Sequence, residues 1–295
     1  HWMVRRQRQM CIRDSYYGGS GVGIGDFDND GYEDIFFAGN IVEDKIYKNL
    51  GDFKFEDKTK FSGIINNGSW STGVTVADVN NDGLLDIYVS CELYDDAPFL
   101  RTNKLYINKG DFKFVESAKK WGVDVDRRTR HSVFFDYNND GLLDLYLLNH
   151  PPNTGNFSPF FGSDMTLPEY NLQLFENKGD HFVDVTEKAG LNRAGFPNAA
   201  VIGDFNKDGW ADIYVANDFD APDFLYFNNR DGTFSYKTES SLRHTSFYSM
   251  GVDAADINND SYLDLMVLDM TAEDNFRLKS NICLLYTSDA ADEPS

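Results

Sequence analysis

The chain of 295 residues carries 48 acidic and 27 basic side chains, and therefore a formal net charge of −21 at pH 7. This balance, with no basic stripe, excludes a nucleic-acid partner, because phosphates need basic side chains to neutralise them. Hydrophobic residues make up 41% and aromatic residues 15% of the chain, which supplies a large packed core and excludes a disordered protein. No apolar stretch is long enough to insert into a membrane.

The two ends do not share the composition of the rest. Residues 1–15 contain an isolated basic run, and residues 283–295 follow no repeat or strand pattern. Both tracts resemble translated sequencing-adapter sequence, so we interpret them as non-native and expect the folded region to be 16–282. The alternative for the basic run is a localisation role for its arginines. Without these tracts Cys91 is the single cysteine, which predicts no disulfide framework.

A nine-residue acidic pattern occurs five times between residues 26 and 264. It reads Asp-x-Asp/Asn-x-Asp-Gly-x-x-Asp, except that the fifth copy has Ser261 at the glycine position. Ca²⁺ prefers oxygen ligands spaced in this way, and glycine at position 6 allows a sharp reversal of the chain. We therefore predict up to five structural Ca²⁺ ions, held by the side chains at positions 1, 3, 5 and 9 and by the backbone carbonyl at position 7. The predicted ligands are Asp26, Asp28, Asp30, Tyr32 and Asp34; Asp78, Asn80, Asp82, Leu84 and Asp86; Asp136, Asn138, Asp140, Leu142 and Asp144; Asp204, Asn206, Asp208, Trp210 and Asp212; and Asp256, Asn258, Asp260, Tyr262 and Asp264.

Two other interpretations of these loops are weaker. An EF-hand requires flanking helices and a glutamate at position 12, where this chain has the apolar residues Phe37, Val89, Leu147, Val215 and Val267. Ordinary β-turns explain one such loop, but five copies that all keep the carboxylate at position 9 favour metal ligation. Because Ser261 replaces a glycine where a side chain is strained, we expect the fifth loop to bind calcium most weakly or with shifted geometry.

Short strands are predicted on both sides of the acidic loops. Residues 21–25, 72–76 and 199–203 precede loops and are rich in small side chains, as expected where inner strands crowd around an axis. Apolar β-branched and aromatic runs such as 35–37 and 87–89 follow the loops. A second hairpin follows in each of the first four repeats. The predicted hairpins are 45–47 with 53–55, 104–106 with 112–114, 172–175 with 181–183, and 224–227 with 233–236.

The spacing of the loops predicts the fold class. They begin 52 to 68 residues apart, and a period near this size is typical of propeller blades. Strand, acidic loop, strand, strand, turn and strand make one four-stranded blade. We therefore predict an all-β β-propeller with four complete blades and a partial fifth. The predicted blades span approximately 18–57, 71–117, 131–185, 198–238 and 248–282.

The five loops and their strands resemble FG-GAP/VCBS repeats, which form the β-propeller of integrin α subunits. Tyr17-Gly18-Gly19, Arg243-His244-Thr245-Ser246 and Leu268-Asp269-Met270 resemble the bacterial branch related to cartilage acidic protein, which often carries an ASPIC/UnbV domain. The resemblance covers residues 16–282. It implies a ring of seven blades, of which this chain supplies a part. Loops of this kind suit the near-millimolar calcium outside the cytoplasm, so we expect an extracellular, cell-surface or periplasmic protein.

The face opposite the acidic loops is where we expect a ligand. Trp70, His131, Asn198 and Tyr248 precede or begin their inner strands and are predicted to ring the upper mouth of the central channel. A ring of this composition could hold a sugar or a peptide, whereas the alternative is that Trp70 and Tyr248 only plug the channel. The further candidates on this face are His150, Asp218, Asp220 and His244.

No arrangement of residues in the sequence indicates a catalytic site. We therefore expect a non-enzymatic, Ca²⁺-binding recognition or adhesion scaffold that presents loops to a glycan or protein ligand. The alternative is a carbohydrate-active enzyme, such as a polysaccharide lyase, that uses the pairs Arg130–His131 and Arg243–His244. A third interpretation is a structural segment of a larger surface protein without a ligand of its own.

Overall fold

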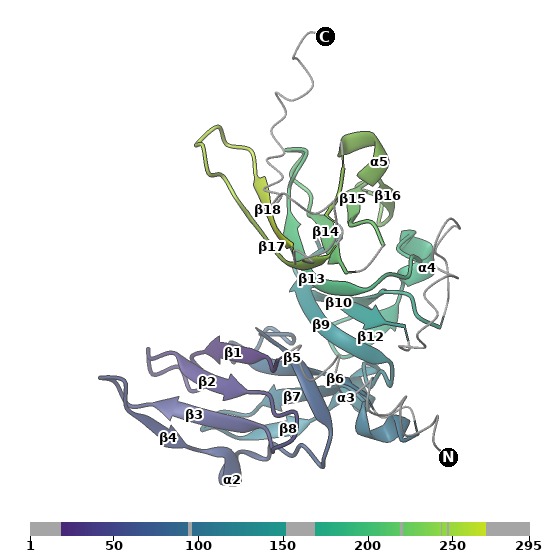
Figure 1. Cartoon of the computed structure of the whole chain (residues 1–295). Coiled ribbons are helices and arrows are strands. Elements are labelled where there is room, and N and C mark those ends of the chain that lie inside the picture. The colour runs from purple at the N-terminus through teal and green to yellow at the C-terminus, as the bar shows by residue number, and fades with distance from the viewer. Residues whose placement is uncertain are drawn as a thin grey trace.

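The computed structural model describes residues 19–93, 96–151, 169–218, 221–242, 244–246 and 248–269. These residues form four antiparallel sheets of four strands and one sheet of two strands. The sheets follow one another in chain order along an arc, with the first sheet and the last hairpin at its two ends (Figure 1). The predicted all-β propeller fragment, with four complete blades and a partial fifth, is therefore confirmed. The two terminal tracts, 1–15 and 283–295, lie outside the described residues.

Each sheet is one blade, numbered here in chain order. Blade 1 contains β1 (Val22–Gly25), β2 (Asp34–Phe37), β3 (Lys45–Asn49) and β4 (Phe55–Asp57), and α2 (Thr59–Ser62) follows it. Blade 2 contains β5 (Trp70–Ala77), β6 (Asp86–Glu92), β7 (Lys104–Asn108) and β8 (Phe114–Glu116), with η1 (Pro98–Leu100) before β7 and α3 (Ala118–Trp121) after β8. Blade 3 contains β9 (Arg128–Phe135), β10 (Asp144–His150), β11 (Gln173–Asn177) and β12 (Phe182–Asp184), followed by α4 (Thr186–Ala189). Blade 4 contains β13 (Pro197–Gly203), β14 (Asp212–Asn217), β15 (Phe224–Asn228) and β16 (Phe234–Tyr236), followed by α5 (Thr238–Ser241), and blade 5 contains β17 (Ser249–Ala255) and β18 (Asp264–Asp269).

The outer strands begin later than the sequence predicts. β4 starts at Phe55 and β8 at Phe114. The residues predicted to begin these two strands belong instead to the turns before them. Asp52 and Phe53 have φ of 51° and 54°, and the corresponding residues of blade 2 also have positive φ. Left-handed backbone of this kind ends strand pairing, so the predicted strand starts at 53 and 112 are wrong by two residues. The short helices after the outer strands have no counterpart in the prediction.

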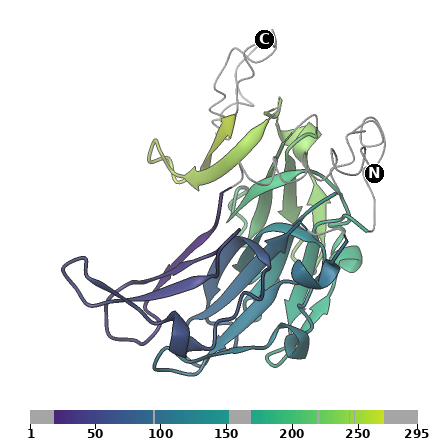
Figure 2. The same cartoon turned by 60° about the horizontal axis from the view of Figure 1, so that its bottom comes forward.

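The core lies between successive blades, where sheet faces pack against each other (Figure 2). Between blades 1 and 2, Phe36 and Ile46 pack in one buried cluster with Ile87 and Tyr106. Burying large side chains of this type stabilises the fold by about 1.5–3 kcal/mol each. Because each blade covers the face of the next, the blades fix the relative positions of their loops.

The inner strands β1, β5, β9, β13 and β17 lie side by side along the axis (Figure 1). Small residues permit this approach: a Cβ added to Gly73 of β5 would lie 2.9 Å from the carbonyl oxygen of Arg130. Side chains also link neighbouring inner strands, since the Thr72 hydroxyl donates to the carbonyl of Thr129 at 2.9 Å. The acidic loops leave the carboxyl ends of these strands, and the axial pocket described below lies near their amino ends. Within the described residues, no helix has the length and apolar character needed to cross a membrane.

Candidate metal centres and the axial pocket

Each of the five acidic loops connects the first and second strands of its blade, and each contains the same pattern of hydrogen bonds. In the first loop, Asp26 accepts the amide of Asp30 at 3.0 Å and that of Gly31 at 2.7 Å. The carboxylate at position 5 accepts the amide of position 7 in every loop, as Asp30 does from Tyr32 at 2.9 Å. The same bonds recur in the other loops, at 2.7–3.1 Å. The network curls each loop around the side chains predicted to bind calcium.

The residue at position 9 ties the loop to its blade. Asp86 accepts the amide of Val79 at 3.1 Å and the amide of Asn108, at the end of the third strand, at 2.8 Å. Asp34, Asp144 and Asp212 make the same two bonds in their blades. Each carboxylate oxygen has two acceptor sites, so these bonds leave capacity for a metal ion.

Burial makes the carboxylates at position 9 costly to ionise. Desolvation raises the pKa of Asp86 and of Asp144 to about 7 and that of Asp212 to about 6, against the lowering effect of their two backbone hydrogen bonds. The nearby carboxylates at positions 5 and 1 of each loop raise these pKa values further. A cation among these carboxylates would relieve both the repulsion and the cost of burying charge.

The first loop brings three of its predicted side-chain ligands close together. Carboxylate oxygens of Asp26, Asp28 and Asp34 all lie within 4.8 Å of one another. Oδ1 of Asp28 is buried and has no hydrogen-bond partner among the described residues. Oxygens placed in this way can surround one ion, because Ca²⁺–oxygen distances are about 2.3–2.6 Å. In the other four loops an asparagine offers a neutral amide oxygen at position 3 instead.

The fifth loop keeps the network despite its serine. Ser261 has φ of 69°, and its amide donates to Asp256 at 2.8 Å, as the glycines do in the other loops. Oδ2 of Asp264 accepts the amide of Ile257 at 3.0 Å, but Oδ1 has no partner among the described residues. The fifth loop therefore forms, but with a left-handed backbone at Ser261 and without a hydrogen bond to Oδ1 of Asp264. That it binds calcium most weakly stays a prediction.

Replacing Ser261 by glycine should strengthen calcium binding at the fifth loop by about fivefold to thirtyfold, since a left-handed non-glycine residue costs roughly 1–2 kcal/mol. The measurement is a calcium titration followed through the amide resonance of residue 261. Gly83→Ser is the matched reverse change, because a Cβ on Gly83 would meet nothing within 4 Å and only the backbone preference changes. Unaltered affinity in both variants would contradict a role for this backbone position.

An asparagine that was not among the predicted site residues joins successive blades. Nδ2 of Asn177, at the end of β11, donates to the carbonyl of Val79 in the loop of blade 2 at 2.8 Å and to that of Leu143 at 3.0 Å. Asn108 and Asn228 make the equivalent bonds to the loops of blades 1 and 3. A signal was present: each third strand ends with an aromatic residue, any residue and asparagine.

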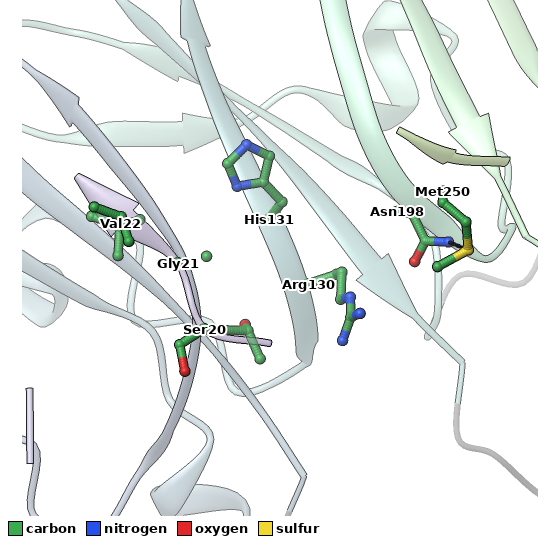
Figure 3. A pocket seen from close by; sticks show the side chains of 10 residues that line it. Ser20, Gly21, Val22, Arg130, His131, Asn198 and Met250 are labelled. Atoms are coloured by element: carbon green, nitrogen blue, oxygen red, sulfur yellow. Dashed lines mark hydrogen bonds between the residues drawn. The ribbon is translucent and has the colours of Figure 1, made fainter. Parts of the chain in front are cut away.

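A cavity of about 290 Å³ lies at the upper mouth of the channel (Figure 3). Arg130 and His131 come from β9, and Asn198 and Met250 come from β13 and β17 on one side of it (Figure 3). Its remaining lining residues are Ser20, Gly21, Val22, Thr72, Gly73 and Val74. Polar side chains of the first four blades therefore meet at the axis.

Of the residues predicted for the ligand face, the structure brings only His131 and Asn198 into this cavity. Trp70 is 5% exposed, and its indole N–H has no hydrogen-bond partner in the described part of the chain. Asp218 and Tyr248 are half-buried and His244 is exposed, and none of the three lines the cavity. Asp220 lies outside the described residues.

The titratable side chains in and near the cavity include one paired arginine and two histidines. The guanidinium of Arg130 pairs with Glu92 at 3.3 Å. Burial, followed by the charge of Arg130, lowers the pKa of His131, so its imidazole is neutral at pH 7. Burial also lowers the pKa of His150 to about 4, and its Nε2 lies 2.9 Å from the carbonyl oxygen of Pro197. The cavity thus offers neutral hydrogen-bonding groups beside one paired guanidinium.

Two solved structures have a limited similarity to this chain. A lectin of Agrocybe aegerita, described for its specific recognition of non-reducing terminal N-acetylglucosamine, has a TM-score of 0.47 and 17% identity, covering 84% of this chain and 60% of that chain. The V. cholerae biofilm matrix protein Bap1 has a TM-score of 0.34 and 13% identity, covering 72% of this chain and 27% of that chain. Neither similarity is high enough to indicate a function.

Sequence comparisons identify the family. Cartilage acidic protein 1 of Homo sapiens is 25% identical over 209 residues, which cover 68% of this chain and 28% of that protein. The Xenopus tropicalis protein of the same name is 28% identical over 135 residues, which cover 45% of this chain and 20% of that protein. The chain therefore spans about a quarter of the length of these relatives. A model of the FG-GAP-like repeat matches residues 26–89, 162–215 and 204–267, more than half of the chain, so the resemblance is confirmed and the chain belongs to the FG-GAP-like repeat family.

Proposed function

We propose that this chain is a calcium-stabilised recognition scaffold that acts outside the cytoplasm, on the cell surface, in the periplasm or in the extracellular space. The observation that carries the proposal is the acidic loop, which has the same hydrogen-bonded form in all five blades and whose predicted ligands are all oxygen atoms. Calcium sites of this kind are occupied where the calcium concentration is near millimolar, as it is outside the cytoplasm. The ions would be structural, since they lie in the loops that anchor the blades.

The axial cavity is the proposed recognition site, and a terminal sugar of a glycan is the ligand that it suits. Its volume of about 290 Å³ is close to the lower end of small-molecule sites, which suits one or two sugar units rather than a protein surface. Asn198, His131 and Arg130 supply hydrogen-bonding groups, and Met250 and Val22 supply apolar surface. Hydroxyl groups and the apolar face of a sugar ring require both kinds of contact.

Arg130→Gln should reduce binding to a defined oligosaccharide at least tenfold, because hydrogen bonds from a charged group are worth about 1.5–3 kcal/mol. The measurement is calorimetric titration with the tightest ligand from an oligosaccharide panel, in saturating calcium. Lys119→Gln removes the same charge from an exposed position on α3 and should leave binding unchanged. Equal melting temperatures would show that both variants are folded.

Three results would contradict parts of this proposal. Binding that survives Arg130→Gln would move the ligand away from the axial cavity. Binding to proteins but to no oligosaccharide would replace the glycan by a protein partner. Cleavage of a polysaccharide that is lost in His131→Ala would instead establish the carbohydrate-active enzyme, since His131 lies in the same cavity as Arg130.

A further inference from the structure

In the first acidic loop, an ammonium group lies among the carboxylates and pairs with two of them. The fourth loop has a single, more exposed pair, between Arg230 and Asp208 at 3.1 Å. Nζ of Lys48, from β3, lies 2.6 Å from Oδ2 of Asp30 and forms a second ion pair with Asp28. The lysine side chain is only 19% exposed. Its Nζ also lies 5.5 Å from the centre of the Phe112 ring of blade 2. Lys48 is thus held in place by both its own loop and the next blade.

In blades 1 and 3, the residue before the asparagine that ends the third strand contacts position 3 of the acidic loop. In blade 1 this residue is Lys48, and it pairs with Asp28. In blade 3 it is Glu176, whose carboxylate accepts Nδ2 of Asn138 at 3.3 Å. The pair of residues at these two positions therefore differs between the blades. It is aspartate with lysine in blade 1 and asparagine with glutamate in blade 3. In blade 2 the corresponding residue is Ile107, which is buried in the core and carries no charge.

We propose that Lys48 sets the calcium affinity of the first loop by acting as an internal cation that competes with the ion. This inference rests on the proposed calcium function. The ammonium donates to oxygens of Asp28 and Asp30, both of which are predicted calcium ligands, and it repels any cation that enters. Oδ1 of Asp28 keeps a free acceptor position, so calcium binds more weakly rather than being excluded. The first loop therefore binds calcium more weakly than the second, where Ile107 offers no charge.

In the calcium-free protein, the first loop should be easier to keep closed than the second and third. Lys48 neutralises part of the charge of the first loop, so that this loop needs less help from calcium to remain closed. The second and third loops have no lysine in this position and depend more strongly on the ion. Blade 1 is therefore expected to keep its loop geometry at calcium concentrations at which the second loop opens.

The experiment is a calcium titration of the full chain by nuclear magnetic resonance. The amides of Gly31 and Gly83 donate to the position 1 carboxylates of the first and second loops, so their resonances report each loop separately. In the unaltered chain, Gly31 should respond at a calcium concentration at least tenfold higher than Gly83. Lys48→Met, which keeps the apolar stem, should lower the midpoint of Gly31 at least tenfold and leave that of Gly83 unchanged.

Lys45→Met is the matched control, since Lys45 lies on the same strand but pairs with Asp57 at 3.0 Å, away from the loop. The double variant Asp28→Asn with Lys48→Glu recreates the charges of the third loop and should also tighten the first. Equal midpoints for Gly31 and Gly83, or a midpoint insensitive to Lys48→Met, would overturn this inference while calcium binding itself stands. If millimolar calcium moves none of the glycine amides, the proposed calcium function fails as well.

Discussion

Removal of calcium should lower the melting temperature of this chain by roughly 20 °C or more. A site occupied at 100 times its Kd stabilises the folded state by about 2.7 kcal/mol, so several sites together equal the whole stability of an ordinary domain. For a chain of this size, each kcal/mol corresponds to about 2–4 °C in melting temperature. The measurement is thermal unfolding in excess calcium and in chelator at constant ionic strength.

The physical reason lies in the buried carboxylates at position 9. Asp34, Asp86, Asp144, Asp212 and Asp264 are all at most 1% exposed. Each shares a loop with at least two further aspartates, and the loop must hold these like charges close together when no cation is present. Loss of a bound ion would therefore remove its favourable binding free energy. It would also leave the repulsion between the aspartates of the loop to destabilise the folded state.

Controls separate ligation from general screening of charge. Magnesium at equal concentration should stabilise the chain less, since it demands a smaller octahedral site and keeps its water. Asp82→Asn should remove one equivalent of tightly bound calcium in a calorimetric titration, because it weakens the second loop alone. A folded chain with the same melting temperature in calcium and in chelator would show that the loops are only turns.

The fold was predictable because its signal is local and repeated. The pattern from Asp26 to Asp34 fixes a sharp loop between two strands, and five copies at similar spacing require five similar hairpins. The small residues around Gly73 indicated the inner strands, where close approach leaves no room for side chains. Such features follow from short stretches of sequence, and tertiary contacts only reinforce them.

Other features depend on contacts between distant residues and could not be predicted from one repeat alone. Phe53 and Phe112 look like strand residues by composition, yet each adopts positive φ in a turn. The bond from Asn177 to Val79 joins residues 98 positions apart. Trp70 was expected at the channel mouth as one of a ring, but its side chain is only 5% exposed and does not line the axial cavity. The burial of a side chain is decided by neighbouring blades rather than by its place before a strand.

Asn177→Ala should be among the most destabilising single changes in this chain, with a loss of about 3–6 kcal/mol in the free energy of unfolding. The side chain is fully buried, and its Nδ2 satisfies the carbonyls of Val79 and Leu143. Its Oδ1 also accepts the amide of Gly179 at 2.8 Å. Alanine removes the partner of the buried Val79 carbonyl, which costs about 1–3 kcal/mol, and removes two further hydrogen bonds at the less buried Leu143 and Gly179.

Asn49→Ala is the matched control, because Asn49 has the same place in blade 1 but no blade before it among the described residues. Its Nδ2 donates only to the carbonyl of Glu33, within the same blade, at 3.0 Å, and its Oδ1 accepts the amide of Gly51 at 2.9 Å. Its side chain is also half-buried rather than fully buried. The control should therefore cost only about 1–2 kcal/mol, and the difference between the two variants measures the link between blades.

Urea unfolding in saturating calcium gives both free energies, and hydrogen exchange shows where each variant loosens. Asn177→Ala should increase exchange on both sides of the boundary between blades 2 and 3, since Asn177 also donates its backbone amide to Asp144 in the acidic loop of its own blade. One residue thus connects the acidic loop of its blade to that of the preceding blade. Equal free-energy losses in the two variants would mean that the blades are held together by apolar packing alone. A larger loss for Asn177→Ala means that this polar link between the acidic loops of two successive blades contributes to stability beyond apolar packing.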